Sequence, residues 1–187
     1  VVSDDSPGTA IEAIVAGARD SRVRYVRNRP RLGFGGNFSQ CLSLARGEYI
    51  KFLNDDDRLR PQCVEVLAGV LSANPAVVLA TSRRAVIDEG GQKLPDIAAT
   101  RPLAQVGALF PGVELGDFVL ANSTNFIGEP TTVLFRRGAL DLEDGLLFRW
   151  GGRDYHCLAD LSLWLRLLLR GPAYYVAWTL SEFRVHG

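Results

Sequence analysis

The chain has few residues of the kinds that mark disulfide-rich or zinc-binding proteins. Its 187 residues include three cysteines and two histidines, and no two cysteines form a Cys-x-x-Cys pair. A disulfide framework or a zinc site of the usual spacing is therefore not expected, and this cysteine usage fits a reducing compartment. We accordingly expect a cytoplasmic protein, or one that is peripheral at the inner face of the membrane.

The sequence also lacks net charge and any long apolar run. Lys plus Arg number 21 and Asp plus Glu number 21, so the formal net charge is zero. The chain therefore has no net positive charge that would attract nucleic acid or anionic lipid. The most apolar run, residues 161–169, contains Arg166 and has about half the length of a membrane span. We expect neither a nucleic-acid partner nor a transmembrane segment in this chain.

What is present is the composition of a globular domain. Apolar residues make up 47% of the chain and charged residues 22%, values close to globular averages. At roughly 150 residues per domain, the length predicts a single domain over residues 1–187. The chain contains no methionine, and residues 1–5 resemble the end of a strand that runs into an acidic turn. We therefore expect a fragment that begins inside its domain.

Short β-branched runs alternate with amphipathic stretches of helical length, the pattern of an α/β protein. This order predicts βαβ units that form a mostly parallel sheet flanked by helices, and residues 88–103, rich in Gly, Pro, Asp and Thr, are expected to form a surface loop. The expected strands are residues 1–2, 23–26, 49–53, 77–81, 131–136 and 174–178, and the expected helices are residues 9–18, 35–45, 61–74 and 158–169.

An acidic run, Asn-Asp-Asp-Asp at residues 54–57, directly follows the expected strand at 49–53. Neighbouring carboxylates about 4 Å apart repel by roughly 4 kcal/mol per pair at an effective dielectric near 20. A hard divalent cation, Mg²⁺ or Mn²⁺, would offset this repulsion. The alternative is a solvated turn that caps the following helix.

A second acidic pair, Asp4 and Asp5, follows the strand at residues 1–2 in the same way. Ligand sites in open α/β sheets lie at the carboxyl ends of strands, so both acidic turns are expected at one edge of the sheet. A carboxylate there can accept hydrogen bonds from a nucleobase or a ribose. Taken alone, the Asp4–Asp5 pair is typical of a turn.

The motifs of the first sixty residues occur in a characteristic order. The strand with its Asp pair comes first, then Asn37, then residues 45–50 with Gly47-Glu48-Tyr49-Ile50, and last residues 52–57, Phe-Leu-Asn-Asp-Asp-Asp. In this order they resemble family 2 glycosyltransferases of the GT-A fold. The resemblance implies an α/β, Rossmann-like domain with a nucleotide-sugar-binding half at residues 1–87 and an acceptor-side half at residues 104–187.

The resemblance also implies an activity and its partners. Such an enzyme moves a sugar, with inversion, from a donor of the UDP, dTDP or GDP type to the hydroxyl of a glycan or lipid-linked acceptor, in bacterial cell-surface glycan synthesis. The resemblance implies that the nucleotide sugar is bound by Asp4, Asp5, Asn37, Asp55 and Asp56. Asp4 would contact the base, Asp55 the ribose, and Asp56 a Mn²⁺ or Mg²⁺ ion that bridges the diphosphate.

Residues 159–167 resemble the Glu-Asp segment that opens a buried helix near the acceptor in this family. Ala159 replaces the usual Glu, while Asp160 is retained. The resemblance makes Asp160 the general base that takes the proton of the acceptor hydroxyl. The alternative is a carboxylate that only caps the helix N-terminus.

Two further segments carry candidates for acceptor or diphosphate contacts. Residues 125–137 resemble the acceptor-side strand of the family, where Glu129 would contact the acceptor or the leaving group, or pair with Arg136 or Arg137. Residues 183–186, Phe-Arg-Val-His, resemble the family's Tyr-Arg-x-His ending. Arg184 and His186 are both candidates for contacts with the diphosphate or metal, and we expect only one of the two to face the site.

The sequence departs from the family pattern in three places. Asn54 stands where many members have the first Asp of the acidic turn, Ala159 replaces a Glu, and the family's opening strand has no counterpart. These departures leave open a non-catalytic nucleotide-sugar-binding or scaffold domain. A nucleotidyltransferase, which also uses paired carboxylates and Mg²⁺, is a further alternative.

Overall fold

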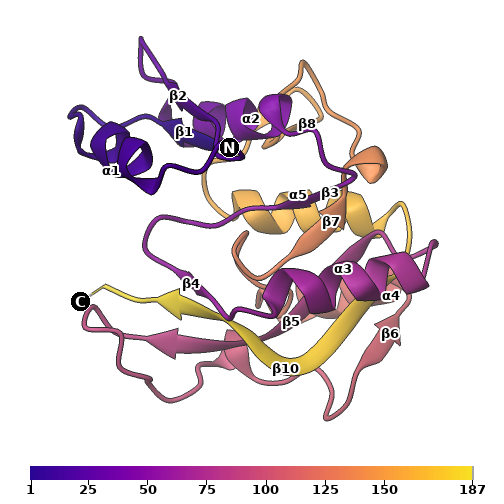
Figure 1. The fold of residues 1–187 in the computed structure, drawn as a ribbon. Coiled ribbons are helices and arrows are strands. Elements are labelled where there is room, and N and C mark those ends of the chain that lie inside the picture. Colours follow the sequence, from indigo (N-terminus) through magenta and orange to yellow (C-terminus); the bar gives the residue numbers. More distant parts are fainter. Residues whose placement is uncertain (187) are drawn as a thin grey trace. The chain divides into compact units, whose positions relative to one another are not determined.

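The computed structural model describes residues 1–186 and divides the chain into two compact units (Figure 1). The first unit comprises residues 1–47 and 141–159, and the second comprises residues 48–140 and those from 160 onward. No helix within residues 1–186 is long and apolar enough to cross a membrane. The expected single domain over residues 1–187 stays a prediction.

The first unit contains a short parallel sheet with helices beside it. Strand β1 (Val2–Asp4) pairs in parallel with β2 (Tyr25–Arg27), and helix α1 (Ala10–Ala18) connects them. Helix α2 (Gly33–Leu44) follows, and strands β8 (Arg149–Trp150) and β9 (Arg153–Asp154) form an antiparallel hairpin. This β1–α1–β2 arrangement is the βαβ unit that the sequence predicted, and it ends in two polar turns at the carboxyl ends of its strands.

Aromatic rings join α2 to the segment before the hairpin. Phe34 and Phe38 are four residues apart, so they lie on one face of α2. Their ring centroids are 5.3 and 5.4 Å from that of Phe148, and the Phe34 ring stacks nearly parallel to it. Ser39 also accepts, through its hydroxyl oxygen, a hydrogen bond from the main-chain nitrogen of Leu147 at 2.9 Å. These contacts fix the helix whose first turn meets Asp5.

The second unit is built on a six-stranded sheet with the order β3-β7-β5-β10-β4, in which β6 also pairs with β10. The strands are β3 (Tyr49–Lys51), β4 (Arg58–Leu59), β5 (Leu79–Ile87), β6 (Ala108–Phe110), β7 (Leu134–Arg136) and β10 (Ala173–Arg184). The helices are α3 (Cys63–Ala73), α4 (Gly112–Ala121) and α5 (Ala159–Leu168), with short 3₁₀ turns at Ala98–Thr100 and Arg137–Ala139. In Figure 1 the long yellow strand β10 runs beside β5 along most of its length.

Helices pack on both faces of this sheet. On one face, α3 buries Cys63, Leu67 and Leu71, spaced one helical turn apart, against the side chains of Ala80, Leu134, Val176 and Leu180. Side chains alternate along a strand, so Phe135 points to the other face. There its ring centroid lies 6.0 Å from that of Trp164 in α5. The α/β class with a central sheet between helices is thereby confirmed.

The pairing of the sheet corrects one expectation. Within residues 48–186 the one parallel pair is β5 with β10, whereas β3–β7, β5–β7, β4–β10 and β6–β10 are antiparallel. The sheet of this unit is therefore mixed and not mostly parallel. Apolar, β-branched runs indicate buried strands but carry no signal for their direction, and the elements at residues 108–121 that reverse the chain were not identified.

Candidate functional site

The acidic turn after β3 is anchored by Asp57, whose side chain is buried. Its two carboxylate oxygens accept hydrogen bonds from the main-chain nitrogen of Arg184 at 2.9 Å and from the side-chain amide of Asn54 at 3.1 Å. The main-chain nitrogen of Asn54 in turn donates to the hydroxyl of Thr131 at 3.0 Å. Asp55 is exposed and Asp56 is half-buried. The turn thus uses Asp57 for its own structure and leaves Asp55 and Asp56 accessible.

Arg184 and His186 meet this turn in different ways. The guanidinium of Arg184 donates to the main-chain oxygens of Asp56 at 2.7 Å, Asp88 at 2.6 Å and Glu89 at 2.8 Å. The imidazole of His186 lies 3.1 Å from a carboxylate oxygen of Asp56. Arg184 is therefore occupied by main-chain carbonyls, whereas His186 faces the carboxylate.

Asp56 and His186 form a pair of potential metal ligands that solvent can reach. Their side chains are 39% and 58% exposed. A carboxylate oxygen and an imidazole nitrogen are both ligands of Mn²⁺, and carboxylates also bind Mg²⁺. Within residues 1–186 no group of three or more His, Cys, Asp or Glu side chains is arranged to hold a metal ion.

A buried ion pair joins β5 to the segment before β7. The side chain of Arg84 is 2% exposed, and its Nε lies 2.6 Å from a carboxylate oxygen of Glu129. Arg84 also donates to the main-chain oxygen of Asn125 at 2.9 Å. Burial raises the pKa of Glu129, and the nearby Arg84 charge partly offsets this rise. Glu129 therefore pairs with Arg84, while Arg136 pairs with Glu48 at 2.9 Å.

Asp160 lies in the first turn of α5, beside the same segment. One carboxylate oxygen accepts from the side-chain amide of Asn125 at 2.9 Å, and the other accepts from the main-chain nitrogen of Leu161 at 2.8 Å. Burial raises the pKa of Asp160, against the effect of these hydrogen bonds and of Arg84. A carboxylate with a raised pKa is a stronger base, and the helix N-terminus favours its charged form.

The turn between Asn125 and β7 depends on Gly128. Its φ of +115° is one that side-chain-bearing residues rarely adopt, and a Cβ there would lie 2.8 Å from the Cβ of Thr132. The main-chain oxygen of Gly128 accepts from the indole nitrogen of Trp164 at 2.7 Å. The backbone at Gly128 is thereby tied to α5, the helix that carries Asp160.

In the first unit, Asp4 and Asp5 point to different partners. Asp4 is 1% exposed and accepts from the Tyr25 hydroxyl at 2.6 Å and from the main-chain nitrogen of Ser6 at 2.8 Å. Hydrogen bonding by Ser6 and then by Tyr25 lowers its pKa to about 2. The Tyr25 pKa is raised to about 12, first by burial and then by Asp4. Asp4 is therefore ionised and held by neighbouring groups.

Asp5 lies at the first turn of α2, where it accepts from the main-chain nitrogens of Leu32 at 2.7 Å and Gly33 at 2.9 Å. The side-chain amide of Asn28 donates to Asp5 at 3.3 Å and to the side-chain oxygen of Asn37 at 3.0 Å. The structure thus brings Asp5 and Asn37 together through Asn28. Hydrogen bonds from Leu32 and Gly33 lower the pKa of Asp5, although burial acts in the opposite direction.

Four residues of these networks were missed in the sequence: Asn28, Asp57, Arg84 and Asn125. Two of them had a signal. Asn28 directly follows a strand at the edge where Asp5 was expected, and Arg84 is a charged residue next to an apolar strand run. Asp57 was seen only as a member of the acidic run. Asn125 had no local signal, because its role depends on contacts with a helix 35 residues away.

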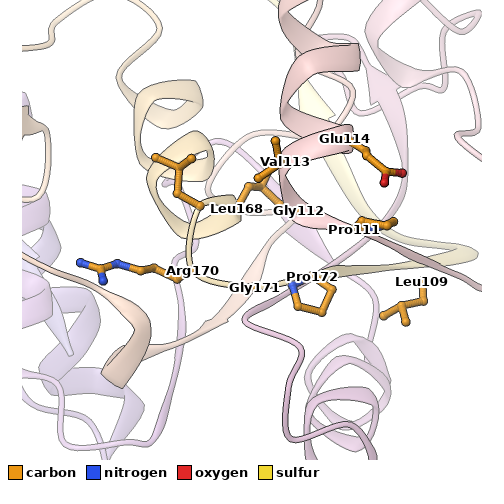
Figure 2. Close-up of a pocket in the computed structure, with 10 residues that line it drawn as sticks. Leu109, Pro111, Gly112, Val113, Glu114, Leu168, Arg170, Gly171 and Pro172 are labelled. Atoms are coloured by element: carbon orange, nitrogen blue, oxygen red, sulfur yellow. The ribbon is translucent and has the colours of Figure 1, made fainter.

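A separate open depression of about 460 Å³ lies between the start of α4 and the end of α5 (Figure 2). Apolar side chains, among them Leu109, Val113 and Leu168, form much of its lining, and Glu114 and Arg170 lie at its border. None of the residues that line it is a predicted site residue.

Comparisons with known proteins are consistent with one family. The family model "Glycosyl transferase family 2" matches residues 1–142. "Uncharacterized protein MT1568" of Mycobacterium tuberculosis is 35% identical over 194 residues, which cover 98% of this chain and 57% of that protein. "Uncharacterized glycosyltransferase MJ1057" of Methanocaldococcus jannaschii is 31% identical over 78 residues, covering 42% of this chain and 27% of that protein.

The fold also resembles solved structures of TarS from Staphylococcus aureus. The TarS 1–349 structure in complex with UDP-GlcNAc superposes with a TM-score of 0.72 and 13% identity, covering 100% of this chain and 49% of that one. A second structure of TarS 1–349 gives a TM-score of 0.68 and 14% identity over 98% and 50% of the two chains. The chain thus spans about half the length of TarS 1–349 and 57% of the mycobacterial relative.

Proposed function

The chain belongs to glycosyl transferase family 2 and has the GT-A fold, and we propose that it transfers a sugar from a nucleotide-diphosphate sugar to an acceptor hydroxyl. The transfer is a single displacement with inversion at the anomeric carbon. The acceptor hydroxyl gives its proton to Asp160 and forms the new bond to the anomeric carbon. The bond from that carbon to the diphosphate breaks on the opposite face, and its electron pair leaves with the diphosphate.

Asp160 is the proton acceptor in this proposal because of its surroundings. It is a half-buried carboxylate whose pKa burial raises, and it lies at the N-terminus of α5. Raising the pKa of a carboxylate toward the working pH makes it a more effective general base, provided that it stays ionised. The helix N-terminus and the Arg84 charge favour the ionised form.

We assign nucleotide-sugar binding to Asp4, Asp5 and Asn37, with the base at the turn that Asp4 and Asp5 form, and we assign the ribose to Asp55, which is exposed. The solved structure of TarS with UDP-GlcNAc supports a UDP-type donor as the first to be tested, beside the dTDP and GDP types.

A Mn²⁺ or Mg²⁺ ion fits the accessible Asp56–His186 pair. When bound there, it would stabilise the negative charge of the leaving diphosphate as a Lewis acid. The guanidinium of Arg184 donates a hydrogen bond to the main-chain oxygen of Asp56 and so holds the main chain of the turn in place. The acceptor, a glycan or lipid-linked molecule of bacterial cell-surface synthesis, and the cytoplasmic location stay predictions.

One observation carries the proposal: the accessible carboxylate of Asp56, presented by a turn that Asp57 anchors, lies against His186 in a chain that matches this family. Asn54 is part of that anchor, since its amide donates to Asp57. An Asp at position 54 would place a second carboxylate against Asp57. The departure at Asn54 is thus explained by the hydrogen bonding of the turn and does not favour a non-catalytic domain.

The first experiment is calorimetric titration of the protein with UDP, dTDP and GDP, each with and without Mn²⁺. We expect one nucleoside diphosphate to bind in a Mn²⁺-dependent manner, and Asp56→Ala to abolish the Mn²⁺ dependence. Asp117→Ala, which removes an exposed carboxylate of α4, is the matched control and should bind as the unmodified protein does. Metal-independent binding, or binding that Asp56→Ala leaves intact, would contradict the assignment.

Turnover then separates an enzyme from a binding domain. With the corresponding nucleotide sugar, we expect release of the nucleoside diphosphate and its loss in Asp160→Asn. Binding without turnover would favour the non-catalytic alternative. Release of pyrophosphate from a nucleoside triphosphate would instead identify a nucleotidyltransferase.

A further inference from the structure

The segment from Asn125 to Glu129 is held on two sides inside the second unit. Arg84 of β5 donates to the main-chain oxygen of Asn125 at 2.9 Å and pairs with Glu129 at 2.6 Å, so it contacts both ends of the segment. Trp164 of α5 donates to the main-chain oxygen of Gly128 at 2.7 Å. A segment held by a buried guanidinium and a buried indole has little freedom to move relative to the sheet or to α5.

The side chain of Asn125 is oriented within this segment. Its amide oxygen accepts from the main-chain nitrogen of Gly128 at 3.0 Å, and its amide nitrogen donates to Asp160 at 2.9 Å. The Gly128 contact assigns the two ends of the amide, because a main-chain N–H can only meet the oxygen. The nitrogen is therefore directed at the Asp160 carboxylate.

Each oxygen of Asp160 consequently has a fixed neighbour, Asn125 on one side and the main-chain nitrogen of Leu161 on the other. A carboxylate has about four lone-pair sites on its two oxygens, so these two hydrogen bonds leave it able to accept a further one from an incoming hydroxyl. The two donors fix the plane of the carboxylate. A general base acts efficiently only when its free lone pair is aligned with the proton that it takes.

We propose that Asn125 is a positioning residue for Asp160, and that the buried Arg84–Glu129 pair holds Asn125 in that role. The inference rests on the proposed function, in which Asp160 is the general base. The charged groups that face Asp160 are Arg84 from β5 and, through the Arg84 pair, Glu129 from the segment before β7. The carboxylate of Glu129 neutralises part of the Arg84 charge. Asn125, which is uncharged, is the residue whose side chain donates a hydrogen bond to Asp160 directly.

The proposal is tested with Asn125→Ala and Asn125→Asp. Asn125→Ala removes the donor to Asp160, whereas Asn125→Asp keeps the oxygen that accepts from Gly128 and replaces the donor with a second carboxylate. Asn122→Ala is the matched control, since Asn122 is an exposed residue that bonds to Phe118 at the end of α4. Thermal unfolding and affinity for UDP with Mn²⁺ establish that each variant is folded and binds as before.

The decisive measurement is the pKa of Asp160, followed by carboxyl ¹³C NMR in the unmodified protein and in each variant. Loss of a hydrogen bond to the charged form should raise this pKa by about one unit in Asn125→Ala. The rise should be larger in Asn125→Asp, because like charges then meet. Asn122→Ala should leave the pKa unchanged. An unchanged pKa in folded Asn125→Ala overturns the positioning role, whether or not the protein turns over.

Kinetics give a second readout that a purely structural role would not produce. In Asn125→Ala, we expect kcat for nucleoside diphosphate release to fall about ten- to a hundredfold with the donor KM unchanged, and the acid limb of the pH profile to move to higher pH with the pKa of Asp160. Equal changes in kcat and in UDP affinity would overturn the proposal. If Asp160→Asn retains full turnover, the proposed function fails instead, and the NMR result stands on its own.

Discussion

The carboxylate of Asp57 accepts a hydrogen bond from the main-chain nitrogen of Arg184 at 2.9 Å, joining two residues that are 127 positions apart. The side chain of Arg184 makes a second hydrogen bond to the turn, which it donates to the main-chain oxygen of Asp56. Two hydrogen bonds therefore join the acidic turn to the end of β10, one accepted by the turn's side chain and one by its main chain. The accessible carboxylates of the turn depend on a strand at the other end of the chain.

The first prediction concerns the stability of this turn. Asp57→Ala leaves the donors of Asn54 and Arg184 without their acceptor, so the free energy of unfolding should fall by about 1–3 kcal/mol. Asp55→Ala removes an exposed carboxylate from the same turn and should change it by less than about 0.5 kcal/mol. Urea denaturation followed by circular dichroism measures both. Equal losses in the two variants would contradict the anchoring role of Asp57.

The second prediction separates a positioning role of Arg184 from a charge that meets the diphosphate. Arg184→Lys keeps the charge but loses the fork that reaches three carbonyl oxygens. If Arg184 positions the turn, Arg184→Lys and Arg184→Gln should both weaken Mn²⁺-dependent UDP binding about tenfold, equivalent to about 1.4 kcal/mol. Calorimetry gives the affinities. Near-normal binding by the lysine variant alone would show that the charge is what matters.

A third prediction follows from the burial of Arg84 and Glu129. Glu129→Gln leaves the Arg84 charge buried without its ionic partner and should cost about 3–5 kcal/mol of stability. Arg84→Met leaves a buried carboxyl group, which can take up a proton because burial already raises its pKa. The double variant Arg84→Met/Glu129→Gln should lose less free energy of unfolding than the two single variants lose together. A double-mutant cycle based on urea denaturation measures this difference.

The pH dependence of Arg84→Met follows from the sign of that pKa shift. A carboxyl group whose folded-state pKa lies above its unfolded value of 4.5 favours folding when protonated. The stabilising contribution of this one group is then fully present below pH 4.5 and is lost as the pH rises through its folded-state pKa. Without Arg84, this loss should be larger than in the unmodified protein. A pH profile of Arg84→Met that parallels that of the unmodified protein would contradict the ion pair.

Much of the architecture could be predicted because local patterns of apolar residues indicate the helices and strands. The spacing of Cys63, Leu67 and Leu71 marks the buried face of α3, and the apolar run before Asp55 marks β3. In contrast, β5 continues to Ile87, well beyond the predicted end at Thr81. Charged side chains at residues 83–84 concealed this continuation, because the partner that compensates Arg84 is 45 residues away.

The candidate site was predictable to the extent that its residues belong to short motifs. Asp56 and Asp160 lie in motifs that the sequence displays. Their supporting contacts come from distant segments, such as Asn125 to Asp160 and Arg184 to Asp57. Hydrogen-bond partners of this kind leave no periodicity in the sequence, so only the fold identifies them.

The last prediction uses Asp4, whose pKa is lowered from 3.8 to about 2 by hydrogen bonding from Ser6 and then from Tyr25. A carboxyl group with a depressed folded-state pKa stabilises the fold above its unfolded pKa, and this contribution is lost as the pH falls from 3.8 toward 2. Urea midpoints measured between pH 5 and about 2 should therefore fall more steeply in the unmodified protein than in Asp4→Asn. Tyr25→Phe removes one donor to Asp4, so its slope should lie between the two. Asp117→Asn, an exposed carboxyl group on α4, should keep the steep slope, and a shallow slope in this control would assign the acid sensitivity to general charge and not to Asp4.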